Sequence, residues 1–311
     1  MNKVQFQNSD FLPNFFLIIP TILILISFIF FPSEFENETT IYLYIPLFLS
    51  LTLLGIGFYL SEKNFYPNIL KMSGWIFFSF YWITQIKVFL GYEDLVNASL
   101  CILGIYVLFY FAYREWLSYE HDFDIDCLDW AAGTAAISGW IYFGIEITPL
   151  STWLIEVVAQ QSGSLLNLFT GNVEVFGRNI FYDGKHSVSI IFACTAIQSM
   201  VIFVGIIFPL KKVEISRKIY GFLLTIIPVY LLNLIRNASI AYMMGEKVTS
   251  FSFAHNVLGK GGSLIALIVL LFIVARFIPE IFDEIYCLMD LPKRKGPLEE
   301  KIQNYFKRVI K

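Results

Sequence analysis

The sequence predicts an all-α integral membrane protein, built as a bundle of about eight transmembrane helices. Of its 311 residues, 57% are hydrophobic and 15% are charged, whereas soluble domains average about 25% charged residues. The mean hydropathy is +0.66, and eight segments are apolar enough to form membrane helices of about 20 residues. These observations exclude a soluble enzyme and a disordered protein. The net charge of −3 offers no field for binding nucleic acid.

The first half of the chain accounts for five of the expected spans, at residues 11–32, 41–60, 72–91, 97–113 and 129–147. The first span is too long for a cleavable signal peptide, and no small-residue cleavage site follows it. The connections between these spans are short, which favours antiparallel neighbours in a helix bundle.

The second half contains three further spans, at residues 188–208, 218–236 and 261–279, and two long connections that we expect to face outward, at 148–187 and 237–260. Within the first connection, apolar side chains from Trp153 to Leu168 recur at helical spacing. Polar residues interrupt them, so we expect an amphipathic helix at the membrane interface. Three glycines break the chain after this helix, at positions 171, 177 and 184. We expect residues 1–289 to form a single membrane domain, followed by a basic cytoplasmic tail over 290–311.

Lys and Arg near the span ends predict that both termini are cytoplasmic. The connection at 209–217 contains Lys211, Lys212 and Arg217, and the tail is also basic, whereas the connections at 33–40 and 92–96 lack basic residues. The stretch 114–128 departs from this alternation, because Arg114 is its only basic residue. Acidic residues contribute little to orientation, so the prediction stands.

Three polar residues stand out because this topology brings them to the outer side of the membrane. Cys194 lies about two turns into the sixth span, Arg236 ends the seventh span, and His255 precedes the eighth. The ends of consecutive antiparallel helices lie side by side. Because polar side chains within a membrane are costly and commonly functional, we expect these three residues to form a site.

The three residue types have a shared chemical logic. A cysteine is a nucleophile as the thiolate, so it needs a base or a cation nearby. His255 could accept and return the proton. Arg236 stays charged and could stabilise an oxyanion, the thiolate or a substrate carbonyl. Acyl transfer through a thioester is the natural reaction class.

Structural explanations compete with this hypothesis. A cysteine in a membrane helix is most often a small packing residue, and we expect that role for Cys101, Cys127 and Cys287. An arginine at a helix end is often an interfacial anchor whose charge reaches water. The functional interpretation is favoured because all three candidates occur on one side of the membrane.

Other polar residues are weaker candidates. Gln198, one turn after Cys194, and Asn233 could contact a bound substrate peptide. His186 is a rival for the base. Asn-x-Ser/Thr sequons on the expected outer side begin at Asn37, Asn97 and Asn237. We find no spacing typical of a metal site and expect neither a metal nor a cofactor.

Three motifs resemble those of the exosortase/archaeosortase family. They are ACTAIQSM around Cys194, NLIRNASIAY around Arg236 and AHNVLGKGG around His255, in that order. The resemblance covers the C-terminal part of the chain, including RFIPEIFDEIY after the eighth span, whereas residues 1–150 match only in hydropathy. Ala196 stands in ACTAIQ where many members of the family have glycine.

The resemblance implies a cysteine transpeptidase with Cys194 as nucleophile, Arg236 as stabiliser and His255 as acid and base. It further implies that the substrates are secreted surface proteins. Each would end in a recognition motif, a membrane helix and a few basic residues, similar to the PGF-CTERM type. The enzyme would reside in the cell membrane with its catalytic face extracytoplasmic. It would release the tail and transfer the protein to an amine of a membrane lipid.

Two alternatives remain open at the level of sequence. The first is a cysteine protease at the membrane surface, in which water resolves the thioester without transfer to lipid. The second belongs to another class, a membrane transporter. The polar residues gather at one face rather than along a path through the midplane, and no inverted repeat is visible, which disfavours the transporter.

Overall fold

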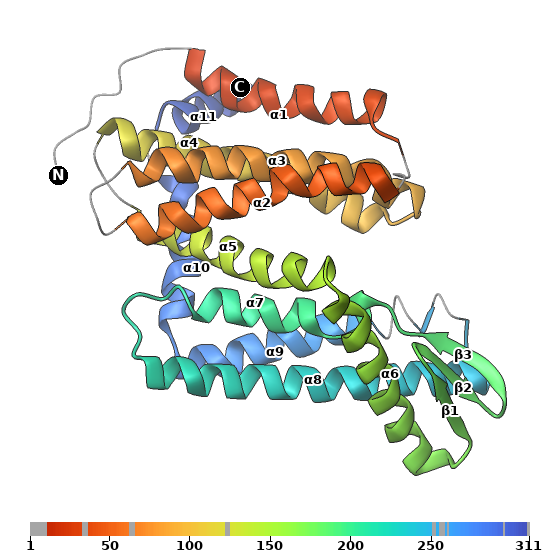
Figure 1. Ribbon diagram of the computed structural model, residues 1–311. Helices are drawn as coiled ribbons and strands as arrows, with labels where there is room; N and C mark the ends of the chain where they lie inside the picture. Colours follow the sequence, from red (N-terminus) through yellow and green to blue (C-terminus); the bar gives the residue numbers. More distant parts are fainter. Residues whose placement is uncertain are drawn as a thin grey trace. The chain divides into compact units, whose positions relative to one another are not determined.

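The computed structural model describes residues 11–32, 37–61, 66–121, 125–250, 253–254, 259, 261–294 and 296–309. Most of these residues are helical (Figure 1). The helices group into two compact units, where the sequence predicted one membrane domain over 1–289. Unit 1 comprises Met1–Ala136 and Glu284–Lys311, and unit 2 comprises Ile137–Asp283. The expected tail at 290–311 therefore belongs to unit 1.

Unit 1 is built on four long apolar helices: α1 (Phe11–Phe30), α2 (Asn37–Leu60), α3 (Pro67–Gly91) and α4 (Leu95–His121). The first half of α5 (Asp126–Glu146) completes this bundle. Its hydrophobic core includes Leu54, Trp75, Ile105 and Phe109, and charged side chains such as Lys71 and Arg114 are also buried in this unit. Proline stands at the first position of α3, where the absent N–H costs no helical hydrogen bond.

The C-terminal segment packs against α4 within unit 1. Arg114 is 2% exposed and donates to the carbonyl of Arg294, at 2.8 Å, and it pairs with Glu299, at 2.9 Å. Glu299 is in the first turn of α11 (Pro297–Val309), the helix formed by the tail. Arg114, the only basic residue of the stretch 114–128, is therefore the buried anchor of the tail.

A disulfide joins Cys127 at the start of α5 to Cys287 on α10 (Glu280–Asp290). The expectation that both were packing cysteines is wrong. Their separation of 160 residues gives no local signal of pairing, because the fold alone brings α5 and the end of α10 together. Cys101 and Cys194 are free and buried.

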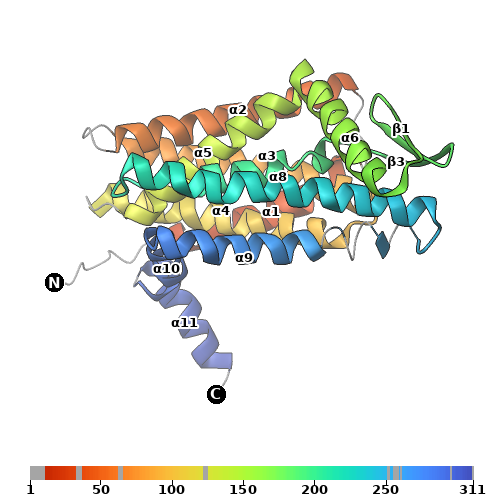
Figure 2. The ribbon, with the colours of Figure 1, turned by 90° about the horizontal axis from the view of Figure 1, so that it is seen from below.

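Unit 2 contains α6 (Pro149–Thr170), α7 (Ile197–Ile207), α8 (Ile215–Gly245) and α9 (Gly262–Phe277). Helix α8 packs against both α7 and α9, and Figure 2 shows α9 running alongside α8. Helix α6 is the predicted amphipathic helix, and it turns away from α5 at an angle of 83°. Thr148 and Pro149 begin it, and Gly171, with φ of 79°, ends it.

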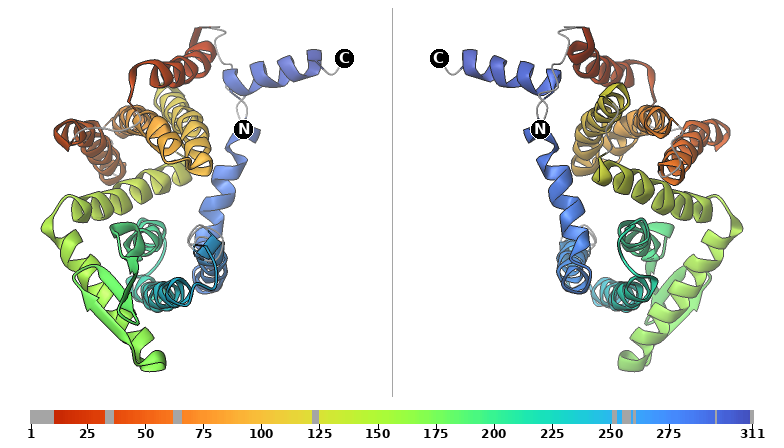
Figure 3. Two further views of the ribbon diagram at one scale, coloured as in Figure 1. Left: turned by 90° about the vertical axis from the view of Figure 1, so that its right-hand side faces the viewer. Right: turned by 90° about the vertical axis from the view of Figure 1, so that its left-hand side faces the viewer.

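A three-stranded antiparallel sheet lies between α6 and α7 in the chain, and the sequence analysis did not anticipate it. Its strands are β1 (Val173–Phe176), β2 (Asn179–Tyr182) and β3 (Lys185–Ser189), in that order. Asp183 and Gly184 both have positive φ and form the two-residue turn between β2 and β3. Helix α6 packs along the sheet (Figure 3), where Gly163 admits the side chain of Val175.

The sheet is anchored to the last turns of α8. The ring of Tyr182 fills the space above Gly245, where an added Cβ would lie 2.4 Å from Cδ1. The hydroxyl of Tyr182 donates to Glu246, at 2.7 Å, and this bond raises the pKa of Tyr182 to about 12. The Ser187 hydroxyl donates to the carbonyl of Ala241. The strand that leads to Cys194 is thus attached to the helix that carries Arg236.

Seven of the eight expected spans each coincide with one helix, from α1 to α5 and at α8 and α9. In the described residues, three helices are long and apolar enough to cross a membrane, at Tyr42–Leu60, Leu95–His121 and Ile215–Gly245. The bent pairs α5 with α6 and α9 with α10 raise this number to five if each is one span. A multi-pass membrane protein is thereby supported, and the number of eight stays a prediction.

Candidate functional site

Cys194 lies in a turn rather than in a helix. Residues Phe192–Cys194 form a single 3₁₀ turn after β3, and α7 begins only at Ile197. The Cys194 N–H donates to the carbonyl of Ile191, at 2.8 Å. The side chain is in the buried core of unit 2 with 9% exposure. The expectation of one helix over 188–208 is therefore wrong for residues 188–196.

Two asparagines of α8 hold the backbone carbonyl of Cys194. The side-chain amide of Asn233 donates to this oxygen at 2.8 Å, and the amide of Asn237 donates at 3.0 Å. The two residues are one turn apart and project from one side of α8. Arg236 lies between them in the sequence, so the turn that carries Cys194 is attached to the stretch of α8 that carries Arg236.

Ala196 gives the turn its shape. Its φ of 68° is in the left-handed region, and it forms the N-cap of α7 without a side-chain hydrogen bond. A non-glycine residue in this region costs roughly 1–2 kcal/mol. The reversal at Ala196 separates Cys194 from α7, so Gln198 does not share a helical face with Cys194 as predicted. Gln198 is exposed and is absent from the cavity lining described next.

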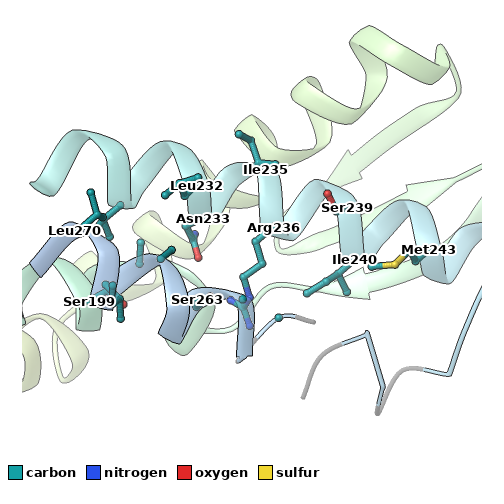
Figure 4. Close-up of a pocket in the computed structure, with 16 residues that line it drawn as sticks. Ser199, Leu232, Asn233, Ile235, Arg236, Ser239, Ile240, Met243, Ser263 and Leu270 are labelled. Atoms are coloured by element: carbon teal, nitrogen blue, oxygen red, sulfur yellow. The ribbon is translucent and has the colours of Figure 1, made fainter. Parts of the chain in front are cut away.

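A cavity of about 270 Å³ lies between the start of α7, the middle of α8 and the start of α9. Arg236 projects from α8 toward the start of α9 along this cavity (Figure 4). Asn233, Ser199 and Ser263 also line it, among mostly aliphatic side chains. Helix α8 continues nine residues beyond the expected end of the span at 236, so Arg236 lies within the helix rather than at its end.

The Nε atom of Arg236 is buried and has no hydrogen-bond partner among the residues that the structure describes. Buried polar groups are normally hydrogen-bonded, and an exception within a cavity calls for an explanation. The guanidinium also lies against Gly259, whose added Cβ would be 3.0 Å from Nε. An arginine that faces a small apolar cavity can bind a carbonyl oxygen or an anion there.

His255 lies outside the described residues, as do its immediate neighbours at 256–258. Two described residues, Ala254 and Gly259, lie on either side of this stretch. Ala254 is fully buried in the same core cluster as Cys194, and Gly259 contacts Arg236 and lines the cavity. The side chain of His186, the rival base, also lies outside the described part of the chain.

Asn237 is a functional candidate that sequence reasoning missed, since it was identified only as the start of a sequon. It is 3% exposed and its amide is bonded to Cys194, so it is not accessible to glycosylation. The amide of Asn97, in the second sequon, donates to Asp94 at 2.8 Å. The side chain of Asn37 lies outside the described residues. The signal for Asn237 was its spacing of four residues from Asn233, which places both amides on one side of a helix.

The described residues contain no group of three or more His, Cys, Asp or Glu side chains that could hold a metal ion. Arg236 lies on the wall of the cavity, whereas Cys194 itself is not among the residues that line it. The Cys194 turn adjoins the cavity through Ala196, which lines it, and through the bond from Asn233, which also lines it. These parts suit nucleophilic attack on a carbonyl carbon and stabilisation of the charge that develops on its oxygen.

Comparison with known sequences defines the class of protein. The family described as "Transmembrane exosortase (Exosortase_EpsH)" matches residues 74–273, which include Cys194, Arg236 and His255. The chain belongs to this family, as the motifs in the sequence indicated. It is therefore a multi-pass membrane protein of a family of sorting enzymes.

One similar curated protein is Archaeosortase A of Haloferax volcanii. The two sequences are 22% identical over 253 residues, which cover 68% of this chain and 81% of the relative. No solved structure matches the chain.

Proposed function

We propose that this protein is a membrane-embedded cysteine transpeptidase that removes the C-terminal sorting tail of secreted surface proteins. The observation that carries the proposal is the attachment of the Cys194 turn to α8 on both sides of Arg236, beside the cavity that Arg236 lines. Membership of the transmembrane exosortase family and similarity to an archaeosortase supply the reaction class.

In the proposed first step, the Cys194 thiolate attacks the carbonyl carbon of the scissile peptide bond. A C–S bond forms, and the carbonyl electrons move to the oxygen, whose negative charge Arg236 stabilises. The oxyanion then collapses and the C–N bond breaks. His255 donates a proton to the departing nitrogen, which leaves with the membrane tail. The substrate is now held as a thioester on Cys194.

In the proposed second step, an amine of a membrane lipid attacks the thioester carbonyl. His255 removes the proton of the amine, the C–S bond breaks, and Cys194 regains its thiolate. The product is an amide between the surface protein and the lipid. Attack by water instead would leave a free carboxylate on the protein.

The topology predicted from Lys and Arg places this site at the extracytoplasmic face of the cell membrane. A secreted substrate that is still held by its own membrane helix would present its recognition motif at this level. Helix α6 and the three-stranded sheet are in the connection predicted to lie on the same side. Substrate recognition would thus occur at the membrane surface.

The proposal is tested with a reporter protein that ends in a motif, a membrane helix and basic residues taken from a surface protein of the same organism. Wild-type enzyme in membranes should shorten the reporter, and Cys194→Ala should abolish shortening with no loss of enzyme. Cys101→Ala is the matched control, because Cys101 is the other free, buried cysteine among the described residues. Full processing by Cys194→Ala would refute the proposal.

Mass spectrometry of the new reporter C-terminus distinguishes transfer to a lipid from hydrolysis. A lipid amide indicates transfer, and a free carboxylate indicates hydrolysis. A thioester intermediate predicts a covalent enzyme–reporter adduct that forms with Cys194 present and is released by hydroxylamine. An adduct that persists in Cys194→Ala would assign the nucleophile to another residue.

A further inference from the structure

The carbonyl oxygen of Cys194 accepts two hydrogen bonds from side chains of one helix. Asn233 and Asn237 both use their Nδ2 groups, at 2.8 and 3.0 Å. A carbonyl oxygen has two lone pairs, so this pair of donors fully occupies it. Both bonds end on the backbone oxygen of Cys194 and not on its sulfur.

The two asparagines carry a cost that a purely packing role would not require. Asparagine is a poor helix former, and both residues stand within a helix long and apolar enough to span a membrane. An amide buried without a partner would be unfavourable there. Both amides find their hydrogen-bond partner in the same carbonyl oxygen. Apolar residues at the two positions would need no such partner.

The bonds constrain the backbone on both sides of the Cys194 Cα atom. The N–H of Cys194 is held by the carbonyl of Ile191, and its C=O is held by the two asparagines. Because each peptide unit is planar, fixing both units fixes the direction in which the Cys194 side chain leaves the backbone. The left-handed Ala196 then turns the chain into α7.

We propose that Asn233 and Asn237 are positioning residues, which hold the Cys194 turn so that the sulfur is aimed at the scissile carbonyl. The inference rests on the proposed function. Helix α8 carries these two amides and Arg236, so one rigid element sets the nucleophile and the stabilising charge relative to each other. A displacement of about 1 Å at a reacting centre can cost about 100-fold in rate.

The test measures reporter-tail processing by full-length enzyme in membranes, with Asn233→Leu, Asn237→Leu and the double variant. We expect each single variant to lower kcat about tenfold and the double variant about 100-fold. KM should be unchanged in Asn237→Leu, because Asn237 bonds to the enzyme's own backbone and is not among the residues that line the cavity, whereas Asn233 lines it. Asn233→Gln keeps an amide donor and should recover part of the loss. Tyr230→Phe is the matched control, because it removes a hydrogen bond from α8 to Gln161 without touching Cys194.

A second measurement separates positioning from other roles. The pH at which alkylation of Cys194 by iodoacetamide is half-maximal should be the same in wild type and in the folded asparagine variants, because the amides do not bind the thiolate. A shift of this midpoint together with kcat would overturn the proposal and indicate action on the sulfur. The proposal would also be overturned if the asparagine variants had the wild-type kcat after normalisation to the amount of Cys194 that iodoacetamide can alkylate.

Different outcomes would refute the proposed function and the positioning role. If Cys194→Ala still processes the reporter, the proposed function is wrong. If Cys194→Ala is inactive while both asparagine variants and the double variant process at the wild-type rate, only the positioning role is wrong.

Discussion

Gly259 lies against the guanidinium of Arg236, so closely that an added Cβ would be 3.0 Å from Nε and 3.2 Å from Nη2. The same Cβ would lie 3.2 Å from Cδ1 of Ile240. Gly259 therefore limits where the guanidinium can be. Glycine at this position leaves room for Arg236 to face the cavity.

Gly259→Ala should displace the Arg236 guanidinium by a few tenths of an ångström and lower tail processing by about 10- to 100-fold, because reaction rates depend on alignment. Gly261→Ala is the matched control, since nothing lies within 4 Å of its added Cβ. Initial rates of reporter processing, normalised to the amount of enzyme in the membrane, provide the measurement. Equal rates for wild type and both variants would show that the position of Arg236 does not limit the reaction.

The positive φ of Ala196 predicts that a substitution to glycine increases stability. Ala196→Gly should stabilise the enzyme by about 1 kcal/mol, because glycine adopts positive φ without the steric cost that alanine incurs. Ala266→Gly, in helix α9 of the same cavity, should instead destabilise by about 1 kcal/mol through lost helix propensity. Thermal unfolding in detergent would compare the two. A loss of stability in Ala196→Gly would contradict the role of this turn.

Most helices could be predicted from the sequence because apolar runs of membrane length are a strong signal. The prediction of one helix for the sixth span was wrong for a physical reason. The apolar run at 188–208 combines the end of a strand, a 3₁₀ turn and the short helix α7. Hydropathy does not distinguish these states in a short apolar run. The Asp183-Gly184 dipeptide, a common hairpin turn that follows Ile180, Phe181 and Tyr182, was the signal that could have revealed the sheet.

The sequence predicted residues of the candidate site, but not the hydrogen bonds that join them. Cys194 and Arg236 were identified from the sequence, and the structure attaches the Cys194 turn to the helix that carries Arg236. The hydrogen bonds from Asn233 and Asn237 could not be foreseen, because a side-chain bond to a distant carbonyl depends on tertiary placement. The same reason hid the pairing of Cys127 with Cys287, which only the folded chain brings together.

The disulfide between Cys127 and Cys287 should stabilise unit 1. Cys127→Ser should lower the free energy of unfolding by about 2–5 kcal/mol, since the bond closes a long loop. Dithiothreitol should lower the unfolding temperature of wild type and leave Cys127→Ser unchanged. The topology predicted from Lys and Arg places both cysteines on the cytoplasmic side, where disulfides are rare, so detecting the bond in native membranes also tests that topology. Two thiols that react freely with maleimide under non-reducing conditions would contradict the bond.

A buried ion cluster in unit 1 supports a last prediction. Lys71 is 2% exposed, pairs with Glu115 at 3.1 Å and also bonds to Asp129. These residues tie the start of α3 to the end of α4 and the start of α5. Because Lys71 faces two carboxylates, its removal leaves buried negative charges close together. Breaking a buried pair in this way costs about 3–5 kcal/mol.

Lys71→Met should therefore lower the unfolding temperature in detergent strongly, and much of the loss should return in the triple variant that adds Glu115→Gln and Asp129→Asn. The matched control is Lys293→Met, which removes the exposed pair of Lys293 with Asp290. We expect no measurable change there, because exposed pairs are screened by water. Equal unfolding temperatures for Lys71→Met and Lys293→Met would show that the buried cluster does not hold unit 1 together. A triple variant no more stable than Lys71→Met would attribute the loss to packing rather than to charge.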